Sequence, residues 1–207
     1  SVDYMVGAQL EGFDIMTHLT EHNEFVVLEG DEYLSSSIDR RPKFHLYKPN
    51  IALISGIAWD HVNVFPTKAD YVEQFKLFIE TMTAGGILIY NQEDEILEEL
   101  VATSEHPIQK IPYQTHPSTV DNGQTQLESE EGPIPLQIFG KHNMSNLSGA
   151  LLVCTQMGIE PVMFYEAIPS FSGASKRLEL FADHPGKRIY RDFAHAPSKV
   201  QATTKAV

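Results

Sequence analysis

The stretch IALISGIAWDHVNVFPTKADYVEQFKLFIETMTAGGILIY, residues 51–90, decides the fold. Its first four residues, IALI (51–54), form an apolar run of the kind found in short strands that are buried on both faces. The part ADYVEQFKLFIETM (69–82) has apolar residues at spacings of three and four, which predicts an amphipathic helix. Those residues are Val72, Phe75, Ile79 and Met82. A glycine pair then ends the helix and ILIY (87–90) predicts the next strand, so the stretch is typical of a parallel sheet.

The flanking sequence continues this alternation of apolar runs and helical periods. Upstream, FVVL (25–28) predicts another short buried strand. Downstream, NQEDEILEELVATS (91–104) predicts a helix with an acidic first turn, and IPLQIFG (134–140) predicts a strand. HNMSNLSGALLVCTQMG (142–158) predicts a loop that leads into a helix, and PVMFYEAIPSF (161–171) predicts a further helix. We therefore expect an α/β fold with a mostly parallel central sheet flanked by helices.

Two segments depart from this pattern. Residues 106–132 contain proline, an Asn122-Gly123 turn signal and no helical period, which predicts a small antiparallel excursion or an extended segment with a hairpin. Near the end, RLELF (177–181) and RIYRDFA (188–194) flank the turn-forming DHPGK and predict two more strands. The last residues, SKVQATTKAV, predict the start of a helix.

The composition limits the class of protein. The 207 residues have a formal net charge of −13, which argues against general nucleic-acid binding, because neutralising phosphates needs clustered Lys and Arg. No apolar run approaches the roughly 18 residues that a membrane helix needs, and no signal peptide opens the chain. Because Cys154 is the single cysteine, we expect a cytoplasmic protein without disulfides. The apolar neighbours of Cys154 favour a buried thiol over a nucleophile.

Two candidate metal ligands follow predicted strands. Glu29 comes directly after FVVL and His61 lies shortly beyond IALI, and ligands of parallel sheets gather beyond the carboxyl ends of the strands. If the two strands are neighbours, both side chains enter one crevice, where a carboxylate and an imidazole suit Mg²⁺ or Mn²⁺. The alternative is that Glu29, with Asp31 and Glu32, is a solvated loop acid and that His61 is a core histidine.

A third segment has side chains suited to a nucleotide. It is GKHNMSN (140–146), between a predicted strand and a helix, where amide and backbone donors can bind adenine or phosphate. The candidate residues are His142, Asn143 and Asn146. The alternative is ordinary helix capping by Asn143 or Ser145.

Three more candidates lie near the end of the chain. Arg177 offers a bidentate contact to phosphate, or is a surface arginine at a strand end. Asp192 and His195, in DFAHAP, follow a predicted strand. An aspartate there can accept hydrogen bonds from ribose hydroxyls, or form a turn.

Taken in order, five motifs resemble the Mur ligase family, the ATP-dependent peptide-bond-forming enzymes of peptidoglycan synthesis. They are LEGDEY, NIALISGIAWDH, FGKHNMSNLSGAL, FSGASKRLEL and RDFAHAP, and together they span nearly all of the chain. YMVGAQLEGF, LEGDEY and FSGASKRLE most resemble the branch of the murein peptide ligases, and the UDP-N-acetylmuramate–L-alanine ligases are the next most similar. The related folylpolyglutamate synthases and a non-catalytic nucleotide-binding remnant are the alternatives.

The resemblance implies a central ATP-binding domain over residues 1–173 and the start of a Rossmann-like C-terminal ligase domain over residues 174–207. The family's phosphate loop, of GTxGKT type, does not occur in this sequence, and the UDP-binding domain has no counterpart. The resemblance therefore predicts a fragment that is not catalytically competent by itself. The sequence leaves the oligomeric state open.

The resemblance also implies roles for the candidate residues. Glu29 and His61 would be magnesium ligands, His142 and Asn146 would lie near the adenine and ribose, Arg177 near the ATP phosphates, and Asp192 on the ribose, with His195 in the same motif. The chain departs from the family at Ser55-Gly56, where Thr-Asn is frequent, so any amide contact there is lost. Lys76 stands where several members have a carbamylated metal-bridging lysine, but its place beside an apolar face favours a lysine that extends its charge to solvent.

The implied reaction uses ATP and Mg²⁺ (or Mn²⁺). The carboxylate of UDP-N-acetylmuramate attacks the γ-phosphate of ATP, while magnesium and Arg177 spread the developing charge. The amine of an amino acid, or of the tripeptide L-Ala-γ-D-Glu-meso-diaminopimelate, then displaces phosphate. The implied partners are these substrates, with no nucleic acid and no membrane.

Overall fold

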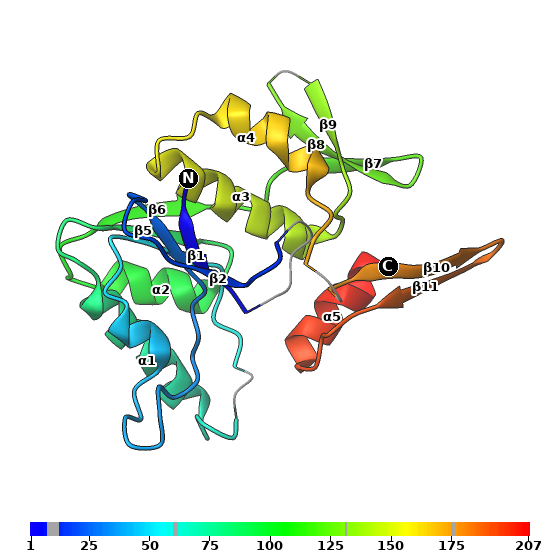
Figure 1. Cartoon of the computed structure of the whole chain (residues 1–207). Helices are drawn as coiled ribbons and strands as arrows, with labels where there is room; N and C mark the ends of the chain where they lie inside the picture. Colours follow the sequence, from blue (N-terminus) through cyan, green and yellow to red (C-terminus); the bar gives the residue numbers. More distant parts are fainter. Residues whose placement is uncertain (8–12, 60–61, 131, 175–176) are drawn as a thin grey trace. The chain divides into compact units, whose positions relative to one another are not determined.

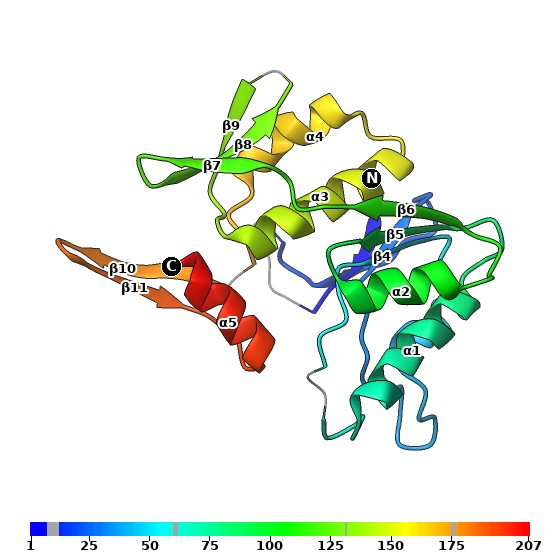
Figure 2. The same cartoon turned by 180° about the vertical axis from the view of Figure 1, so that it is seen from behind.

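The computed structural model describes residues 1–7, 13–59, 62–130, 132–174 and 177–207, and Figures 1 and 2 show its elements from two sides. The chain forms two compact units that alternate along the sequence. The first comprises Ser1–Glu29, Pro117–Asn143 and Tyr165–Val207, and the second comprises Gly30–His116 and Met144–Phe164. The domain boundary predicted at residue 173 stays a prediction.

The second unit contains the predicted parallel sheet. Strands β4 (Ile51–Ile54), β5 (Ile87–Asn91) and β6 (Gln109–Tyr113) run parallel in the order β4-β5-β6. The parallel pairing of IALI with ILIY is therefore confirmed. The expectation for β6 was wrong, because antiparallel or extended structure was predicted there. Its proline, Pro112, suits the edge position that β6 takes, since proline donates no ladder hydrogen bond.

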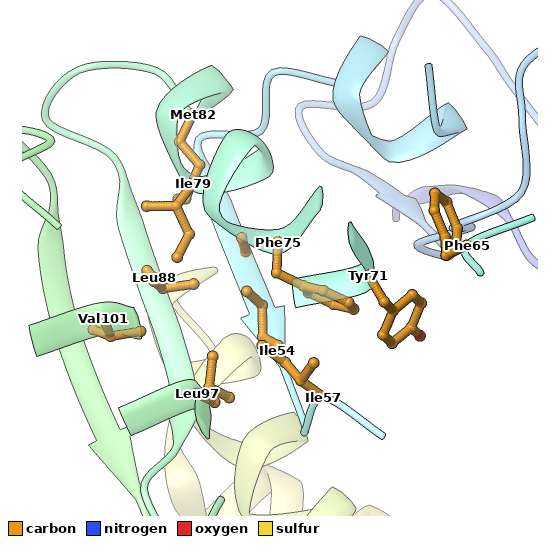
Figure 3. Packing of buried hydrophobic residues seen from close by; sticks show 11 residues of the cluster. Ile54, Ile57, Phe65, Tyr71, Phe75, Ile79, Met82, Leu88, Leu97 and Val101 are labelled. Carbon is orange, nitrogen blue, oxygen red and sulfur yellow. The ribbon is translucent and has the colours of Figure 1, made fainter. Parts of the chain in front are cut away.

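Two helices cover one face of this sheet. They are α1 (Lys68–Thr81) and α2 (Glu95–Thr103), and Figure 2 shows both on the same side of the strands. Figure 3 shows their apolar side chains directed toward Ile54 of β4 and Leu88 of β5. The buried residues of α1 are Tyr71, Phe75 and Ile79, followed by buried Met82, whereas the predicted Val72 is only partly buried. Tyr71 turns inward because its ring packs against those of Phe65 and Phe75, at centroid distances of 5.5 and 5.2 Å.

Helix α3 (Lys141–Gln156) packs on the other face of the sheet through its later part. A Cβ atom added to Gly149 would lie 2.8 Å from Cδ1 of Leu53 and 3.2 Å from Cζ of Tyr113, so the helix approaches the sheet closely. Leu53 points away from Ala52 and Ile54, because side chains alternate along a strand. With both faces covered, Leu88 and Ile89 of β5 are 0% exposed.

The structure begins α3 earlier than the sequence indicated. A loop was predicted from His142, but the helix already starts at Lys141. The local reason is that Asn143 bonds backward twice: its N–H donates to the carbonyl of Gly140 (3.1 Å), and its Nδ2 donates to the carbonyl of Phe139 (2.7 Å). The next predicted helix is confirmed as α4 (Pro161–Ala167), which continues into a 3₁₀ turn, η2 (Ile168–Ser170).

The first unit contains a small mixed sheet in the order β2-β1-β3. Strand β1 (Asp3–Met5) pairs antiparallel with β2 (Thr17–His18) and parallel with β3 (Val26–Leu28). The strand predicted at FVVL exists, but the expectation that both of its faces are buried was wrong. Val26 is 51% exposed and Val27 is 40% exposed, because β3 is a three-residue edge strand.

The predicted antiparallel excursion is confirmed in the same unit. Strands β7 (Ser118–Asp121), β8 (Gln124–Ser129) and β9 (Gly132–Leu136) form a meander. Asn122 and Gly123 connect β7 to β8 with φ angles of 49° and 80°. Two successive positive φ values are the mark of a type I′ hairpin turn, which explains the strong Asn-Gly signal.

The last part of the chain also follows the prediction. Strands β10 (Glu179–His184) and β11 (Lys187–Arg191) form an antiparallel hairpin, and helix α5 (Pro197–Ala206) follows. A short 3₁₀ helix, η1 (Lys43–Leu46), completes the elements of the second unit. None of the helices in the described part of the chain has the length and apolar character that crossing a bilayer requires.

The doubly covered strand β5 sets the stability of the second unit. Truncating Leu88→Ala leaves a cavity in the core and should lower the free energy of unfolding by about 2–5 kcal/mol. Urea unfolding followed by circular dichroism measures this loss. The control is Val120→Ala on β7, where the side chain is 73% exposed and a change within about 0.5 kcal/mol is expected. Equal losses for the two variants would contradict the assignment of β5 as the core strand.

Candidate functional site

The carboxyl ends of the parallel strands in the second unit are joined by polar contacts. Asn91, the last residue of β5, donates from Nδ2 to the carbonyl oxygen of Ser55 (3.2 Å) and to Oγ of Ser145 (3.4 Å). Ser55 directly follows β4 and Ser145 lies in α3. One amide therefore connects the exits of two strands to the helix on the other face of the sheet.

Tyr113, at the end of β6, lies at the same edge of the sheet. Its hydroxyl is buried without a hydrogen bond of normal geometry to any residue in the described ranges. Burial raises the pKa of this hydroxyl, although the nearby hydroxyl of Ser145 opposes the shift. We interpret Tyr113 as a neutral side chain that packs between the sheet and α3.

Asp94 connects the start of α2 with the segment after β4. Its Oδ1 accepts from the backbone N–H groups of Ile96 (3.1 Å) and Leu97 (3.0 Å), which caps the helix. Its Oδ2 accepts from the backbone N–H of Ile57 (2.7 Å). Asn91 and Asp94 were not among the predicted site residues, although both are polar residues that closely follow the strand ILIY.

Of the two predicted metal ligands, Glu29 and His61, the structure describes Glu29. His61 lies outside the described residues. Glu29 directly follows β3 in the first unit, is exposed, and accepts a hydrogen bond at Oε2 from the backbone N–H of Gly7. A Cβ at Gly7 would lie 3.0 Å from that oxygen, so glycine permits the close approach. The strands that lead to the two residues pair with β1 and β5 respectively, and the shared crevice stays a prediction.

The other acids of LEGDEY have structural partners in the second unit. Asp31 forms an ion pair with Lys43 (2.7 Å) and also accepts from the N–H of Tyr33 (2.8 Å). The hydrogen bond from Lys43 to Asp31 raises the pKa of this lysine. Glu32 accepts from the hydroxyl of Tyr71 (3.2 Å), the same residue that packs in the core. Asp31 and Glu32 therefore serve the packing of the second unit, whereas Glu29 accepts its hydrogen bond from Gly7 in the first unit.

Lys76 lies on the solvent side of α1. Its side chain is 53% exposed and forms an ion pair with Glu73 (3.7 Å), one turn away on the same helix. This is the usual arrangement of a surface lysine and gives the carbamate alternative no support. Among the described residues, no three His, Cys, Asp or Glu side chains gather closely enough to hold a metal ion.

The predicted nucleotide residues divide between the two units. His142 and Asn143 belong to the first unit, with Arg177, Asp192 and His195, whereas the exposed Asn146 belongs to the second. His142 is half-buried, and the loss of hydration lowers the pKa of its imidazole, an effect that the charge of Asp192 opposes. The charge of Asp192 thus acts on the imidazole of His142, although the two residues are fifty positions apart in sequence.

Asp192 has an unusual hydrogen-bonding state. Its Oδ1 accepts from the backbone N–H groups of Leu178 (3.1 Å) and Phe193 (2.8 Å). Its Oδ2 is buried and has no hydrogen-bond partner within the ranges that the structure describes. Leu178 has a φ of 47°, in the left-handed region, which is costly for leucine. Strained residues of this kind cluster at functional sites. A buried carboxylate oxygen without a donor is suited to a ligand hydroxyl.

Phe193 was not predicted as a site residue, but it contacts two residues that were, Arg177 and His195. Its ring is 60% exposed, with the guanidinium of Arg177 5.7 Å from its centroid and the ring of His195 at 5.1 Å. His195 also contacts the carbonyl oxygen of Phe193 through Nδ1 (2.9 Å). The sequence signal that could have indicated Phe193 is its place between Asp192 and His195, two predicted site residues.

The burial of His142 predicts a pH dependence of stability. Because its folded pKa is lowered from 6.5, the unfolded chain binds more protons below about pH 6.5, and the contribution of neutral His142 to stability is lost as the pH falls. Changing His142→Gln removes this titration. The wild type should therefore lose more free energy of unfolding than the variant between pH 7.5 and pH 5, as measured by urea unfolding. Equal losses would show that His142 is not buried in its neutral form.

Known proteins share both the sequence and the fold. Residues 9–154 match the Mur ligase middle domain. The UDP-N-acetylmuramate--L-alanyl-gamma-D-glutamyl-meso-2,6-diaminoheptandioate ligase of Escherichia coli (strain K12) is 28% identical over 212 residues, which cover 99% of this chain and 46% of that protein. The UDP-N-acetylmuramate--L-alanine ligase of Arthrobacter sp. (strain FB24) is 28% identical over 192 residues, which cover 85% of this chain and 40% of that protein. The chain thus spans about half the length of the curated relatives it matches.

A solved structure gives the same result for the fold. The murein peptide ligase of Psychrobacter arcticus has a TM-score of 0.68 and 19% identity, with 99% of this chain and 48% of that chain covered. The sequence match extends over more than half of the chain and includes the parallel sheet with its two covering helices. The chain belongs to the Mur ligase family.

Proposed function

We propose that this chain is the ATP-binding part of a ligase that joins an amine to the carboxylate of UDP-N-acetylmuramate. The observation that carries the proposal is the buried, unpartnered Oδ2 of Asp192 beside His142. A ribose hydroxyl would give this oxygen the donor that it lacks in the described residues. Family membership supports the proposal independently, and the substrates are those for which the relatives are named.

The nucleotide would lie against the cluster of the first unit. Asp192 would accept from the ribose, and Arg177, exposed and resting on Phe193, would contact the phosphates. His142 and Asn143 would contact the base from the first turn of α3, and His195 would line the same site. The role of Asn146, which belongs to the second unit, stays a prediction. This assignment uses the neutral state of His142, which burial favours.

Glu29 is the one predicted magnesium ligand among the described residues. Mg²⁺ in nucleotide enzymes is usually held by one or two protein ligands, with the rest from phosphates and water. Glu29 is an exposed carboxylate held in place by Gly7, which suits one such ligand. We propose His61 as the second protein ligand. The cation, Mg²⁺ or Mn²⁺, would neutralise charge on the phosphates.

The proposed reaction has two balanced steps. A carboxylate oxygen of UDP-N-acetylmuramate forms a bond to the γ-phosphorus of ATP, and ADP leaves, which gives an acyl phosphate. The amine then attacks the acyl carbon, loses a proton, and releases inorganic phosphate as the amide forms. Arg177 would stabilise the charge that develops on the transferring phosphoryl group.

The incoming amine is proposed to be the tripeptide L-alanyl-γ-D-glutamyl-meso-diaminopimelate, with L-alanine as the alternative. The Escherichia coli relative named for the peptide matches 99% of this chain, whereas the Arthrobacter relative named for L-alanine matches 85%. A role in cytoplasmic peptidoglycan synthesis or recycling follows from this substrate. A folylpolyglutamate synthase and a non-catalytic remnant stay the further alternatives.

The test is phosphate release from ATP by a form of the protein as long as these relatives. With UDP-N-acetylmuramate and Mg²⁺ present, the tripeptide should stimulate release, because the amine consumes the acyl phosphate. Stimulation by L-alanine alone would assign the alternative substrate. Release that needs no UDP-N-acetylmuramate, or no release with either amine, would contradict the proposed function.

The role of Asp192 is tested by Asp192→Asn. The amide keeps an oxygen for the N–H groups of Leu178 and Phe193 but turns the buried Oδ2 into a donor. The KM for ATP should rise about tenfold or more, the range expected for one hydrogen bond to a charged group. Asp183→Asn on β10 is the control, because Asp183 pairs only with exposed Arg188 among its described contacts (3.4 Å). An unchanged KM in Asp192→Asn would remove Asp192 from the nucleotide site.

A further inference from the structure

The segment that leads into α3, residues 137–140, is contacted along its whole length by later parts of the first unit. Gln137 donates from Nε2 to the carbonyl oxygen of Pro169 in η2 (2.9 Å). The next residue, Ile138, is buried, and a Cβ added to Gly173 would lie 3.6 Å from its Cγ2 atom, at ordinary van der Waals distance. The first half of the segment is therefore packed against η2 and the residues that follow it.

The second half of the segment contacts the last hairpin and the last helix. The ring of Phe139 lies 5.7 Å from the ring of Tyr190 on β11, with an interplanar angle of 62°. A Cβ added to Gly140 would lie 2.7 Å from the Cβ of Ala206, the last residue of α5. Two neighbouring residues thus contact both elements between which Asp192 lies in the sequence.

These two contacts join the two sides of the candidate nucleotide site. On one side, the stretch that contains Asp192 connects β11 to α5, and both of these elements are held against residues 139 and 140. On the other side, His142 is two positions after Gly140, in the first turn of α3. This turn is fixed to the same residues, because Asn143 bonds back to the carbonyl groups of Phe139 and Gly140.

Gly140 is the residue that permits the closest of these approaches. Its φ of 89° lies in the left-handed region, which glycine adopts readily. A side chain at this position would meet Ala206 at 2.7 Å, well inside the ~3.5–4.0 Å of carbon atoms in contact. Because the methyl group of Ala206 is bonded directly to the backbone, α5 itself would have to shift. The same side chain would also lie 3.1 Å from Cε1 of His142.

We propose that Gly140 and Ala206 are positioning residues for the nucleotide, because their close contact seats α5 against the start of α3 and so fixes Asp192 relative to His142. Neither residue is assigned a contact with the nucleotide. The inference rests on the proposed function in one respect, the assignment of Asp192 to the ribose. Groups that are held in place before a ligand arrives bind it more tightly, because less freedom is lost on binding.

The alternative is that the contact only stabilises the first unit. Gly140→Ala places a methyl group against Ala206, and adding Ala206→Gly in the same chain reopens the space. The double variant keeps the backbone strain at position 140 and the crowding of His142, so a recovery isolates the contact with α5. Gly186→Ala is the matched control, because Gly186 has a φ of 77° in the same unit and an added Cβ meets no described atom within 4 Å.

Three quantities are measured on each variant of the protein at the length of its relatives. Calorimetry gives the affinity for ADP with Mg²⁺, phosphate release gives KM for ATP and kcat, and urea unfolding gives stability. Gly140→Ala should weaken ADP binding and raise KM about tenfold, with a much smaller change in kcat. Adding Ala206→Gly should restore most of the ADP affinity. Gly186→Ala should leave ADP affinity and KM unchanged.

The outcomes separate this inference from the proposed function. If Asp192→Asn weakens ADP binding but Gly140→Ala does not, the positioning role is overturned while the nucleotide site stands. If Asp192→Asn leaves ADP binding unchanged, the assignment of Asp192 to the ribose fails and the positioning role fails with it. A loss of affinity that Ala206→Gly does not restore, or an equal loss in Gly186→Ala, would also overturn the inference.

Ala206→Leu covers the case in which Gly140→Ala does not fold. It crowds Gly140 from the side of α5 and leaves the backbone at position 140 unchanged. Gln201→Leu is its control, because Gln201 is exposed on the same helix. Weaker ADP binding in Ala206→Leu alone supports the proposal, and equal ADP affinity in the two variants contradicts it.

Discussion

The burial of β5 on both faces is the constraint on which the second unit depends. Leu88 and Ile89 are neighbours in sequence and therefore point to opposite sides, yet neither is exposed. One side has to be covered by α1 and α2 and the other by α3, which comes close only because Gly149 has no side chain. With both faces closed, the carboxyl edge of the sheet is where polar groups such as Asn91 can meet.

The elements that could be predicted are those with a strong local signal. The parallel strand pair around α1 follows from apolar runs and helical spacing, and the β7–β8 hairpin follows from Asn122-Gly123. Strand β6 could not be recognised as parallel, because its sequence, QKIPY, has no continuous apolar run and contains a proline. The exposure of β3 also depends on its place at a sheet edge, which no local pattern records.

In the candidate site, too, the residue types follow from local sequence, whereas the contacts between distant residues do not. The residue types after each strand could be read from the sequence, and Asp192, His142 and Arg177 were proposed as site residues in this way. The interaction of Asp192 with His142 could not, because the two residues are fifty positions apart and meet only in the folded first unit. Nor could the sequence separate the acids of LEGDEY. Their different roles appear only once Lys43 and Tyr71 are seen to take Asp31 and Glu32.

The hydrogen bond from Ile57 to Asp94 also bears on how this protein can be engineered at the preceding residue. Gly56 looks like a natural target for replacement by a residue with a side chain, since exchanging glycine at a compatible site often stabilises proteins. Here the new side chain would start 3.0 Å from a carboxylate oxygen that already accepts from the next residue. The effect of a side chain at position 56 therefore depends on what faces it, and changing one member of such a pair without the other is a source of non-additivity between neighbouring sites.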